Sequence, residues 1–379
     1  MRICVVTEHH PLALMGGAEY QMDLLARELS SRAGVCVYYL ARSVPSSRTA
    51  STLPYEVRRI GSGAGLRRRA TFFDAAGLLR ALAEIQPSAV YQRGRQSYTG
   101  VCAAYAARAA IPFFFHVASD RDVVPYLLPK GLSFNAPFDL LEGVIGRWGV
   151  RRAQHVIVQS SKQQQLLREH MERSDAVQIG NFQPLPGALP RKPASPLRVL
   201  WVGNIKQLKR PEMFVELAAS FVRRTDLEFH MVGRPARTPR FLPLMRSISA
   251  LANLKFHGEL PLEGVNALMA QASFLVNTSD FEGFPNTFIQ AWARGAVVVS
   301  RVDPCGGMER LEVGYCAADL GELRAVIVAL ADRPAARAEI AQRAFEFAAR
   351  HHSMAEGARL AELIVRAAQE RTARQSCEA

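Results

Sequence analysis

Short runs of β-branched, aromatic and other apolar residues alternate along the chain with stretches whose apolar residues recur at helical spacing. The first run, RICVVTE at 2–8, precedes a glycine turn and AEYQMDLLARELSSR at 18–32. The plan restarts in the middle, where LRVLWVGNI at 197–205 precedes PEMFVELAASFVRR at 211–224. Nearly continuous apolar strands that alternate with helices are typical of parallel sheets covered on both faces. We therefore predict an α/β chain with two Rossmann-like, doubly wound domains.

A proline-rich segment separates the two halves. Its five prolines lack backbone donors and disfavour a helix or central strand, which predicts a linker at 184–196. The first domain is predicted at 1–183, the second at 197–350, and a helix returning to the first domain at 351–379. Ligands of such sheets bind at the carboxyl ends of the strands. A substrate in a central cleft between the two domains is therefore expected.

The stretch EGFPNTFIQAWARG places chemistry at one such strand end. We predict a strand ending at Asn277, then the loop TSDFEGFP, then a helix with Asn286 or Thr287 as its N-cap. The N-terminus of a helix offers N–H groups and a positive dipole end, which suit a diphosphate. Gln290 lies one turn inside the helix, and Glu282 in the loop faces the same ligand.

These motifs resemble a known family. EGFPNTFIQ is similar to the E-x7-E signature of the retaining family-4 glycosyltransferases with the GT-B fold, with Gln290 in place of the second glutamate. MGGAE at 15–19 resembles the family's N-terminal GGAE loop, and WVGNIKQLKRPEMF at 201–214 resembles the start of its second domain. FHMVG, LKFHGELP and HHSMAEGARL match in order and spacing, so the resemblance covers nearly the whole chain. It implies metal-independent transfer of a sugar from a nucleotide diphosphate sugar, with retained configuration and no cofactor.

The resemblance also implies roles for single residues. Glu282 contacts the transferred sugar, and Gln290 stands for the glutamate that binds the ribose hydroxyls. An amide oxygen also accepts hydrogen bonds, so this exchange weakens nucleotide binding modestly. Lys209 neutralises the diphosphate, and His116, at the end of PFFFH, matches the family's histidine near the sugar. The predicted donor-binding residues are Gly203, Asn204, Arg210, Gly283, Phe284, Pro285, Asn286, Thr287 and Gln290.

Other positions complete this prediction. Asn204 stands where arginine is usual in the family, and we expect Lys206 or Arg210 to compensate. Gly16 and Gly17 let backbone N–H groups approach a phosphate or the acceptor without an intervening Cβ. The family implies bacterial surface polysaccharide or glycolipid assembly, with a glycan or lipid-linked acceptor.

Charge and hydropathy limit the partners. The net charge is +13, with 22 basic against 14 acidic residues in 1–190. Basic residues are dispersed, without zinc-finger or RNP patterns, which argues against nucleic acid. LLEGVIGRWGVRRAQH fits either a core helix with a charged face or a helix on an anionic membrane surface. Scattered cysteines, no signal peptide and no apolar run of spanning length predict a cytoplasmic protein. The basic first half agrees with the lipid-linked acceptor that the resemblance implies, so we also expect peripheral contact at the inner membrane face.

Three alternative classes remain. Asp120 and Asp122 formally match the Asp-x-Asp of metal-dependent transferases, although that fold has a single domain. GSGAGL at 61–66 is a poor nicotinamide dinucleotide fingerprint, because Leu66 replaces the third glycine and the run lies far from the first strand. The Asn204 and Gln290 departures also fit an inactive sugar-nucleotide-binding protein.

Overall fold

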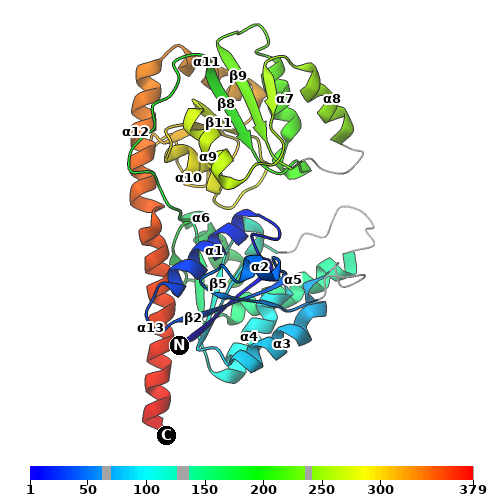
Figure 1. Cartoon of the computed structure of the whole chain (residues 1–379), viewed down its shortest axis with the longest axis vertical. Helices are drawn as coiled ribbons and strands as arrows, with labels where there is room; N and C mark the ends of the chain where they lie inside the picture. The colour runs from blue at the N-terminus through cyan, green and yellow to red at the C-terminus, as the bar shows by residue number, and fades with distance from the viewer. Residues whose placement is uncertain (62–69, 126–135, 235–240, 379) are drawn as a thin grey trace. The chain divides into compact units, whose positions relative to one another are not determined.

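The chain forms two compact units. Unit 1 contains Met1–Gln183 and Met354–Ala379, and unit 2 contains Pro184–Ser353. The chain therefore leaves unit 1, builds unit 2 and returns to unit 1 with its last helix. The residues that the computed structural model describes are 1–61, 70–125, 136–234 and 241–378 (Figure 1).

Unit 1 is built on a parallel sheet. Its described strands are β1 (Arg2–His9), β2 (Cys36–Ser43), β3 (Glu56–Arg59), β4 (Ala89–Arg93), β5 (Phe113–His116), β6 (His155–Val158) and β7 (Val177–Gln178). Its described helices are α1 (Gly17–Ser30), α2 (Ser47–Ala50), α3 (Ala75–Ile85), α4 (Ser97–Ala109), α5 (Ala136–Arg152), α6 (Ser161–Met171) and α13 (Met354–Glu378), with 3-10 turns η2 (Thr71–Asp74) and η3 (Asp120–Asp122). The strand order is β3-β2-β1-β4-β5-β6-β7, which is doubly wound as predicted.

Both faces of this sheet are buried. Along β1, Cys4 and Val6 pack into one core cluster, whereas Ile3 and Val5 pack into the other. Helix α13 lies beside α1 and closes the second cluster with Leu360, Ala361, Ile364 and Ala368 (Figure 1). The predicted return of the C-terminal helix to the first domain is confirmed.

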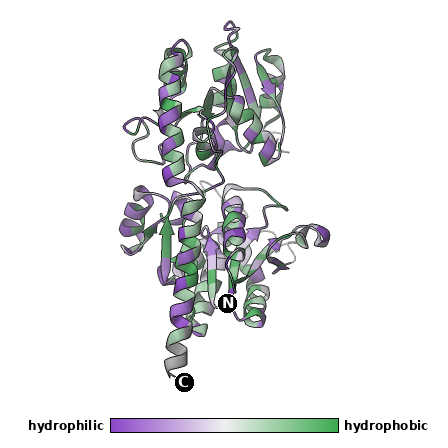
Figure 2. Ribbon diagram, turned by 60° about the vertical axis from the view of Figure 1, so that its left-hand side comes forward, coloured by the Kyte–Doolittle hydropathy of each residue, from purple (hydrophilic) through white to green (hydrophobic). Residues whose placement is uncertain are grey.

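Unit 2 repeats the plan. Its described strands are β8 (Leu197–Val202), β9 (Leu227–Val232), β10 (Leu254–Phe256), β11 (Phe274–Asn277), β12 (Val297–Ser300) and β13 (Gly314–Cys316). Its described helices are α7 (Pro211–Ala219), α8 (Leu242–Ala250), α9 (Leu262–Gln271), α10 (Asn286–Trp292), α11 (Leu320–Ala331) and α12 (Pro334–His351), with the 3-10 turn η4 (Gln207–Lys209). The parallel strands follow the order β10-β9-β8-β11-β12-β13. Figure 2 shows hydrophobic residues concentrated in the strands of both units.

Local details differ from the predicted elements. Helix α7 ends at Ala219 instead of continuing to Arg224, and the Ser220 hydroxyl donates to the Leu217 carbonyl at that end. The proline-rich segment has no helix or strand and packs on unit 2. Its Lys192 ammonium donates to the Ala272 carbonyl just after α9, and burial lowers the pKa of Lys192 to about 7.

Helix α5 presents its small residues inward. Gly146 and Gly149 lie so close to α4 and the loop before it that an added Cβ at Gly149 would sit 2.4 Å from the Thr99 carbonyl carbon. Val150 also packs in the core of unit 1, whereas other large apolar residues of the helix point to solvent, so both interpretations of this segment stay predictions. Among the described helices, none combines the length and hydropathy needed to cross a bilayer. The exposed side chains are Leu140, Leu141, Val144 and Trp148.

The turns after β8 and β9 touch through glycine. A Cβ added at Gly233 would lie 1.9 Å from the Gly203 carbonyl oxygen, which is backbone and cannot swing aside. Gly233→Ala should therefore destabilise unit 2 by about 1–3 kcal/mol in urea unfolding. At Gly264, in α9, the nearest atoms are 3.4 Å or more away. Gly264→Ala should be neutral or stabilising by up to about 1 kcal/mol. An equal loss of unfolding free energy in the two variants would contradict this account.

Candidate functional site

The predicted residues gather where strand order reverses. In unit 2 this point lies between β8 and β11, and in unit 1 between β1 and β4. Loops leaving neighbouring strands in opposite directions open a crevice at such a point. The loop after β8 carries Lys209, and the loop after β11 carries Glu282. The corresponding loops of unit 1 follow β1, β4 and the adjacent strand β5.

Glu282 is held by three donors on one of its oxygens. Lys209 Nζ forms an ion pair with Glu282 Oε1, which also accepts from Ser279 Oγ at 2.7 Å and from Asn277 Nδ2 at 3.3 Å. None of these contacts uses Oε2. The side chains of Glu282 and Lys209 are 13% and 27% exposed. The loop thus fixes the carboxylate while its second oxygen remains for another donor.

The two loops are also joined through their backbones. Thr278 Oγ1 donates to the Lys209 carbonyl at 2.6 Å and accepts from Trp201 Nε1 at 3.0 Å. The Asp280 amide donates to the Leu208 carbonyl. Arg210 has φ of +46° before α7, a strained conformation for a non-glycine residue. These contacts fix where Lys209 stands.

Arg210 is already engaged by acidic groups. Its Nε lies 3.0 Å from Glu212 Oε1, and its Nη1 lies 3.3 Å from Asp280 Oδ1, which Arg301 also contacts. We predicted that Arg210 compensates for the arginine that Asn204 replaces. For this, the Arg210 guanidinium would have to bind a phosphate while it also pairs with Glu212 and Asp280. Lys206, the other candidate, is exposed.

Three neighbouring turns at this sheet edge bring backbone close together. The Gly203 amide donates to the Val232 carbonyl, and the Gly233 amide donates to the Gly258 carbonyl. A Cβ at Gly203 would meet the Trp201 ring at 3.2 Å. Asn204, in the first of these turns, is half-buried. Backbone groups of these turns therefore lie at this edge, and backbone N–H groups in such turns can bind anions.

Helix α10 begins at Asn286, so its N-cap lies one residue before the first predicted position. Pro285 occupies the cap position with extended φ and ψ of −67° and 123°, so the prediction of Asn286 or Thr287 there is wrong. Proline fits because its fixed φ suits the position and its missing N–H is not needed. Gly283, Asn286 and Thr287 are half-buried, and Phe284 packs on the His352 ring at 4.5 Å. Gln290 is only 5% exposed.

The glycine loop of unit 1 holds an acidic side chain. Gly16 is the N-cap of α1, and Gly17 is its first residue. A Cβ at Gly16 would lie 2.2 Å from Glu19 Oε2, so the glycine makes room for this carboxylate. Burial raises the pKa of Glu19. The space that we predicted for an approaching ligand is thus shared with Glu19.

His116 ends β5 inside a polar cluster. Its Nδ1 lies 2.8 Å from the Tyr91 hydroxyl, and the ring is fully buried. Burial, followed by the charge of Arg93, holds the pKa of His116 well below its ordinary value. Arg93, at the end of β4, donates through Nη2 to Asn181 Oδ1. The imidazole is therefore neutral at pH 7.

Several of these side chains carried no predicted role. Glu19 stood inside the quoted GGAE motif, and Arg93 ended the apolar run AVYQRG. A polar residue at the carboxyl end of a buried strand was the signal that could have identified Arg93. Asn181 gave no comparable signal, because its partner Arg93 lies far away in the sequence. Ser279 gave none because its partner Glu282 lies in the same irregular loop.

The structure describes the alternative metal motif in full but only the first residue of the dinucleotide motif. Asp122 accepts backbone N–H groups from Arg95, Ala118 and Ser119, and Asp120 pairs with Lys162. Both carboxylates therefore organise loops. In the described part of the chain, no group of three or more His, Cys, Asp or Glu residues is arranged to hold a metal. Residues 62–66 of GSGAGL lie outside the described residues.

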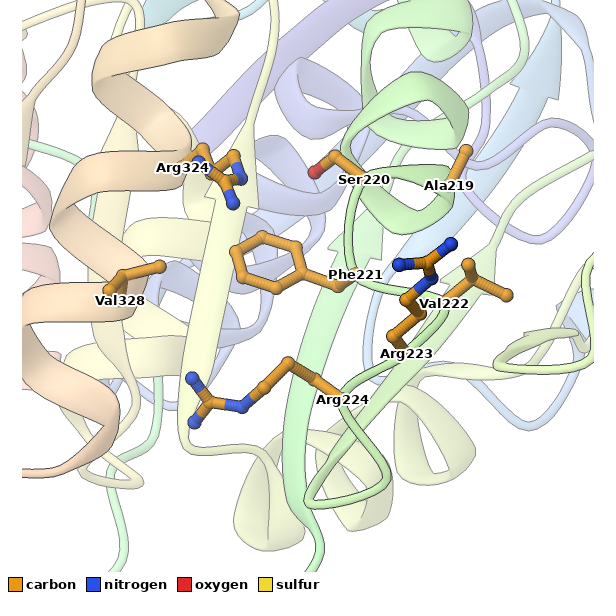
Figure 3. Close-up of a pocket in the computed structure, with 8 residues that line it drawn as sticks. All are labelled: Ala219, Ser220, Phe221, Val222, Arg223, Arg224, Arg324 and Val328. Carbon is orange, nitrogen blue, oxygen red and sulfur yellow. The ribbon is translucent and has the colours of Figure 1, made fainter.

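A pocket of about 460 Å³ elsewhere in unit 2 contains none of the predicted site residues. Figure 3 shows the Phe221 ring at its centre, with Arg324 and Arg224 around it. Arg324 lies 5.6 Å from the ring centroid, and Arg224 pairs with Asp226. This pocket is separate from the loops that hold Glu282 and Lys209.

Both halves of the chain match glycosyltransferase families. Residues 16–181 match the Glycosyl transferase 4-like domain, and residues 196–340 match Glycosyl transferases group 1. A comparison with curated proteins gave no match. With the two doubly wound units, these matches define a glycosyltransferase of the GT-B type. The chain belongs to the glycosyltransferases that combine a 4-like and a group 1 domain.

Solved structures of glycosyltransferases share this fold. Sucrose-phosphate synthase from Thermosynechococcus elongatus has a TM-score of 0.76 at 17% identity, covering 96% of this chain and 98% of that one. Anabaena HepE in complex with UDP-glucose has a TM-score of 0.73 at 17% identity, covering 96% and 99%. WaaG, a glycosyltransferase involved in lipopolysaccharide biosynthesis, has a TM-score of 0.73 at 14% identity, also covering 96% and 99%.

The neutral state of His116 predicts a pH dependence of stability. Because the folded pKa lies below the unfolded value of about 6.5, protonation favours the unfolded chain. The stability that the neutral His116 imidazole contributes is present above about pH 6.5 and is lost as the pH falls towards the folded pKa. Between about pH 6.5 and pH 5, wild type should lose up to about 1.4 kcal/mol per pH unit more than His116→Gln in urea unfolding. Parallel pH profiles for the two proteins would contradict a buried neutral histidine.

Proposed function

We propose that this protein is a retaining glycosyltransferase whose nucleotide diphosphate sugar binds unit 2 at the carboxyl ends of β8 and β11. The observation that carries the proposal is the Lys209–Glu282 ion pair, with Oε1 of the carboxylate held by three donors and Oε2 outside those contacts. In this proposal, Oε2 accepts a hydroxyl of the transferred sugar. Lys209 turns towards the diphosphate when the donor is bound.

The proposed chemistry is a front-face substitution. The bond between the anomeric carbon and the diphosphate oxygen breaks, and the acceptor oxygen bonds to the same face of that carbon. The acceptor proton passes to the leaving phosphate oxygen. Lys209 and the N-terminal turn of α10 stabilise the charge that develops on the leaving group. Because these groups supply positive charge themselves, we propose no essential metal.

His116 is proposed to bind a sugar hydroxyl. Its Nδ1 is engaged with Tyr91, which orients the ring and leaves Nε2 as the atom for a ligand. A neutral imidazole can exchange hydrogen bonds with a hydroxyl without adding a second positive charge beside Arg93. Gly16 and Gly17 are proposed to border the same ligand in unit 1.

The biological setting is proposed from the relatives. HepE is described in complexes with UDP-glucose and with UDP and glucose, and WaaG is described as acting in lipopolysaccharide biosynthesis. These names support a UDP- or related sugar as donor. The lipopolysaccharide role of WaaG supports a role in bacterial surface polysaccharide or glycolipid assembly. We propose that this role is carried out on the cytoplasmic side of the membrane.

Substitution of Glu282 tests this function. Nucleotide release from UDP-, GDP- and ADP-sugars is measured with EDTA present, for wild type, Glu282→Ala and Glu282→Gln. One donor should be hydrolysed slowly by wild type, and both variants should lose at least about 100-fold, since a sugar contact and the Lys209 pair disappear together. Glu339→Gln removes an exposed carboxylate that pairs with Arg343, and it should behave as wild type.

Each other outcome of that assay has a meaning. Donor binding without release, with or without acceptor, would favour the inactive sugar-nucleotide-binding protein. Release that stops with EDTA and returns with a divalent cation would contradict metal independence. Equal rates for wild type and Glu282→Ala would remove Glu282 from the site.

We also propose that α5 rests on an anionic membrane surface. Leu140, Val144 and Trp148 follow one another at four-residue spacing on the outer face, and Arg152 stacks on the Trp148 ring at 4.3 Å. Exposed apolar side chains beside arginines suit the boundary between headgroups and acyl chains. The buried glycine face leaves the larger side chains available for this contact.

Vesicle flotation tests the α5 surface. Wild type should float with vesicles containing phosphatidylglycerol and much less with neutral phosphatidylcholine vesicles. Each apolar side chain taken out of water contributes about 1.5–3 kcal/mol, so Leu140→Gln/Val144→Gln should bind at least about tenfold more weakly. Leu79→Gln, at an exposed site of α3, is the matched control and should float as wild type. Unchanged flotation of the double variant would exclude this surface.

A further inference from the structure

Unit 1 contains two buried arginines whose surroundings differ. Arg42 and Arg93 are both 4% exposed. Arg42, near the end of β2, donates to Asp74 at 2.6 Å, to Glu8 at 2.9 Å and to the Ala70 carbonyl at 2.7 Å. Its charge is therefore compensated by two carboxylates.

Arg93 has no such compensation. Its Nη2 donates to the amide oxygen of Asn181, and the Tyr91 hydroxyl lies against the guanidinium. Its Nε and Nη1 atoms are buried, and neither has a hydrogen-bond partner among the described residues. None of the described carboxylates forms an ion pair with Arg93. The pKa directions agree. Burial lowers the pKa of Arg93, whereas for Arg42 the effect of burial is exceeded by the combined hydrogen bond and charge of its acidic neighbours, chiefly Asp74, which raise the pKa.

A buried guanidinium without a counter-ion is costly, because arginine stays protonated at any physiological pH. The nearby acids offset only part of this cost. Asp122 and Glu19 favour the charged form of Arg93 without forming an ion pair with it, and burial raises the pKa of both carboxyl groups, which favours their neutral forms. The cluster therefore lacks an anion in direct contact with the guanidinium.

The position of the orphaned nitrogen atoms indicates what supplies that charge. Arg93 ends β4 and His116 ends the neighbouring strand β5, at the sheet edge where doubly wound domains bind ligands. Both side chains contact or approach Tyr91, so a group bound by Arg93 would lie beside the imidazole. The planar guanidinium fork suits the paired oxygens of a phosphate or carboxylate.

We propose that Arg93, together with Asn181 and beside His116, binds an anionic group of the acceptor, a phosphate or carboxylate carried by the sugar or lipid that is glycosylated. This specificity rests on the proposed transferase function. Arg93 is a binding residue for the acceptor, and it takes no part in bond breaking. The donor diphosphate belongs to the loops of unit 2.

Thermal unfolding tests the anion site without requiring any turnover. In chloride, Arg93→Met should melt at or above wild type, because it removes an uncompensated buried charge, whereas Arg42→Met should melt lower. Inorganic phosphate at matched ionic strength should raise the melting temperature of wild type in a saturable way. That increment should vanish in Arg93→Met and require at least about tenfold more phosphate in Arg93→Lys, which keeps the charge without the fork.

Two further measurements assign the anion to the acceptor. UDP affinity by calorimetry should be the same for wild type and Arg93→Met; a large loss would assign Arg93 to the donor and overturn the proposal. Nucleotide release is then compared for glucose against glucose 6-phosphate and glucuronate. Stimulation by an anionic member, lost in Arg93→Met, supports the proposal, whereas preference for the neutral sugar overturns it.

The outcomes separate this proposal from the transferase function. A saturable phosphate effect that depends on Arg93, in a protein without Glu282-dependent nucleotide release, would keep the anion site and reject the transferase. Glu282-dependent release without any phosphate effect would keep the transferase and reject the anion site. A melting temperature of Arg93→Met as low as that of Arg42→Met, with the phosphate increment unchanged, would show that Arg93 is structural.

Discussion

The Lys209–Glu282 ion pair connects the two loops that leave the unit 2 sheet where its strand order reverses. Either side chain alone would be a half-buried charge at the end of a loop, so each loop depends on the other for its conformation. The Thr278 contacts with Lys209 and Trp201 hold the same loops through uncharged groups. A donor that takes over one partner of the ion pair would therefore change the electrostatics of both loops, while their backbone remains in place.

Unit 1 also buries ionisable side chains near the ends of its strands, but it accommodates them differently. Its Glu19 and His116 have pKa values shifted towards their neutral forms, chiefly by burial. Arg93 cannot become neutral, and it retains a charge that the surrounding protein does not balance. Arg42, equally buried, is fully paired and serves stability. The two arginines of this sheet thus differ in their partners. Arg42 stabilises the fold through its ion pairs, whereas Arg93 is available to bind an anion in the proposed site.

The architecture could be predicted from the sequence because it follows from local periodicity. The end of β11 at Asn277 and the return of the last helix to the first domain both came from apolar patterns. Side-chain pairing could not be predicted in the same way. Glu282 lies 73 positions from Lys209, and Arg93 lies 88 positions from Asn181, so each contact depends on tertiary placement. Helix α5 was ambiguous because its packing face consists largely of glycines, which give little hydropathy signal.

The glutamine at position 290 has a physical explanation in its burial. Its side chain is 5% exposed on a short helix whose neighbours Phe288, Ile289 and Trp292 are fully buried. A carboxylate there would lose its hydration whether or not a ribose was bound, whereas an amide loses much less on burial. The charged form would regain that cost only through a strong hydrogen bond to the ligand. In a donor site of the proposed kind, Gln290 would therefore exchange affinity in the bound state for stability in the free state. Glu282 differs because Lys209, Ser279 and Asn277 contact its carboxylate.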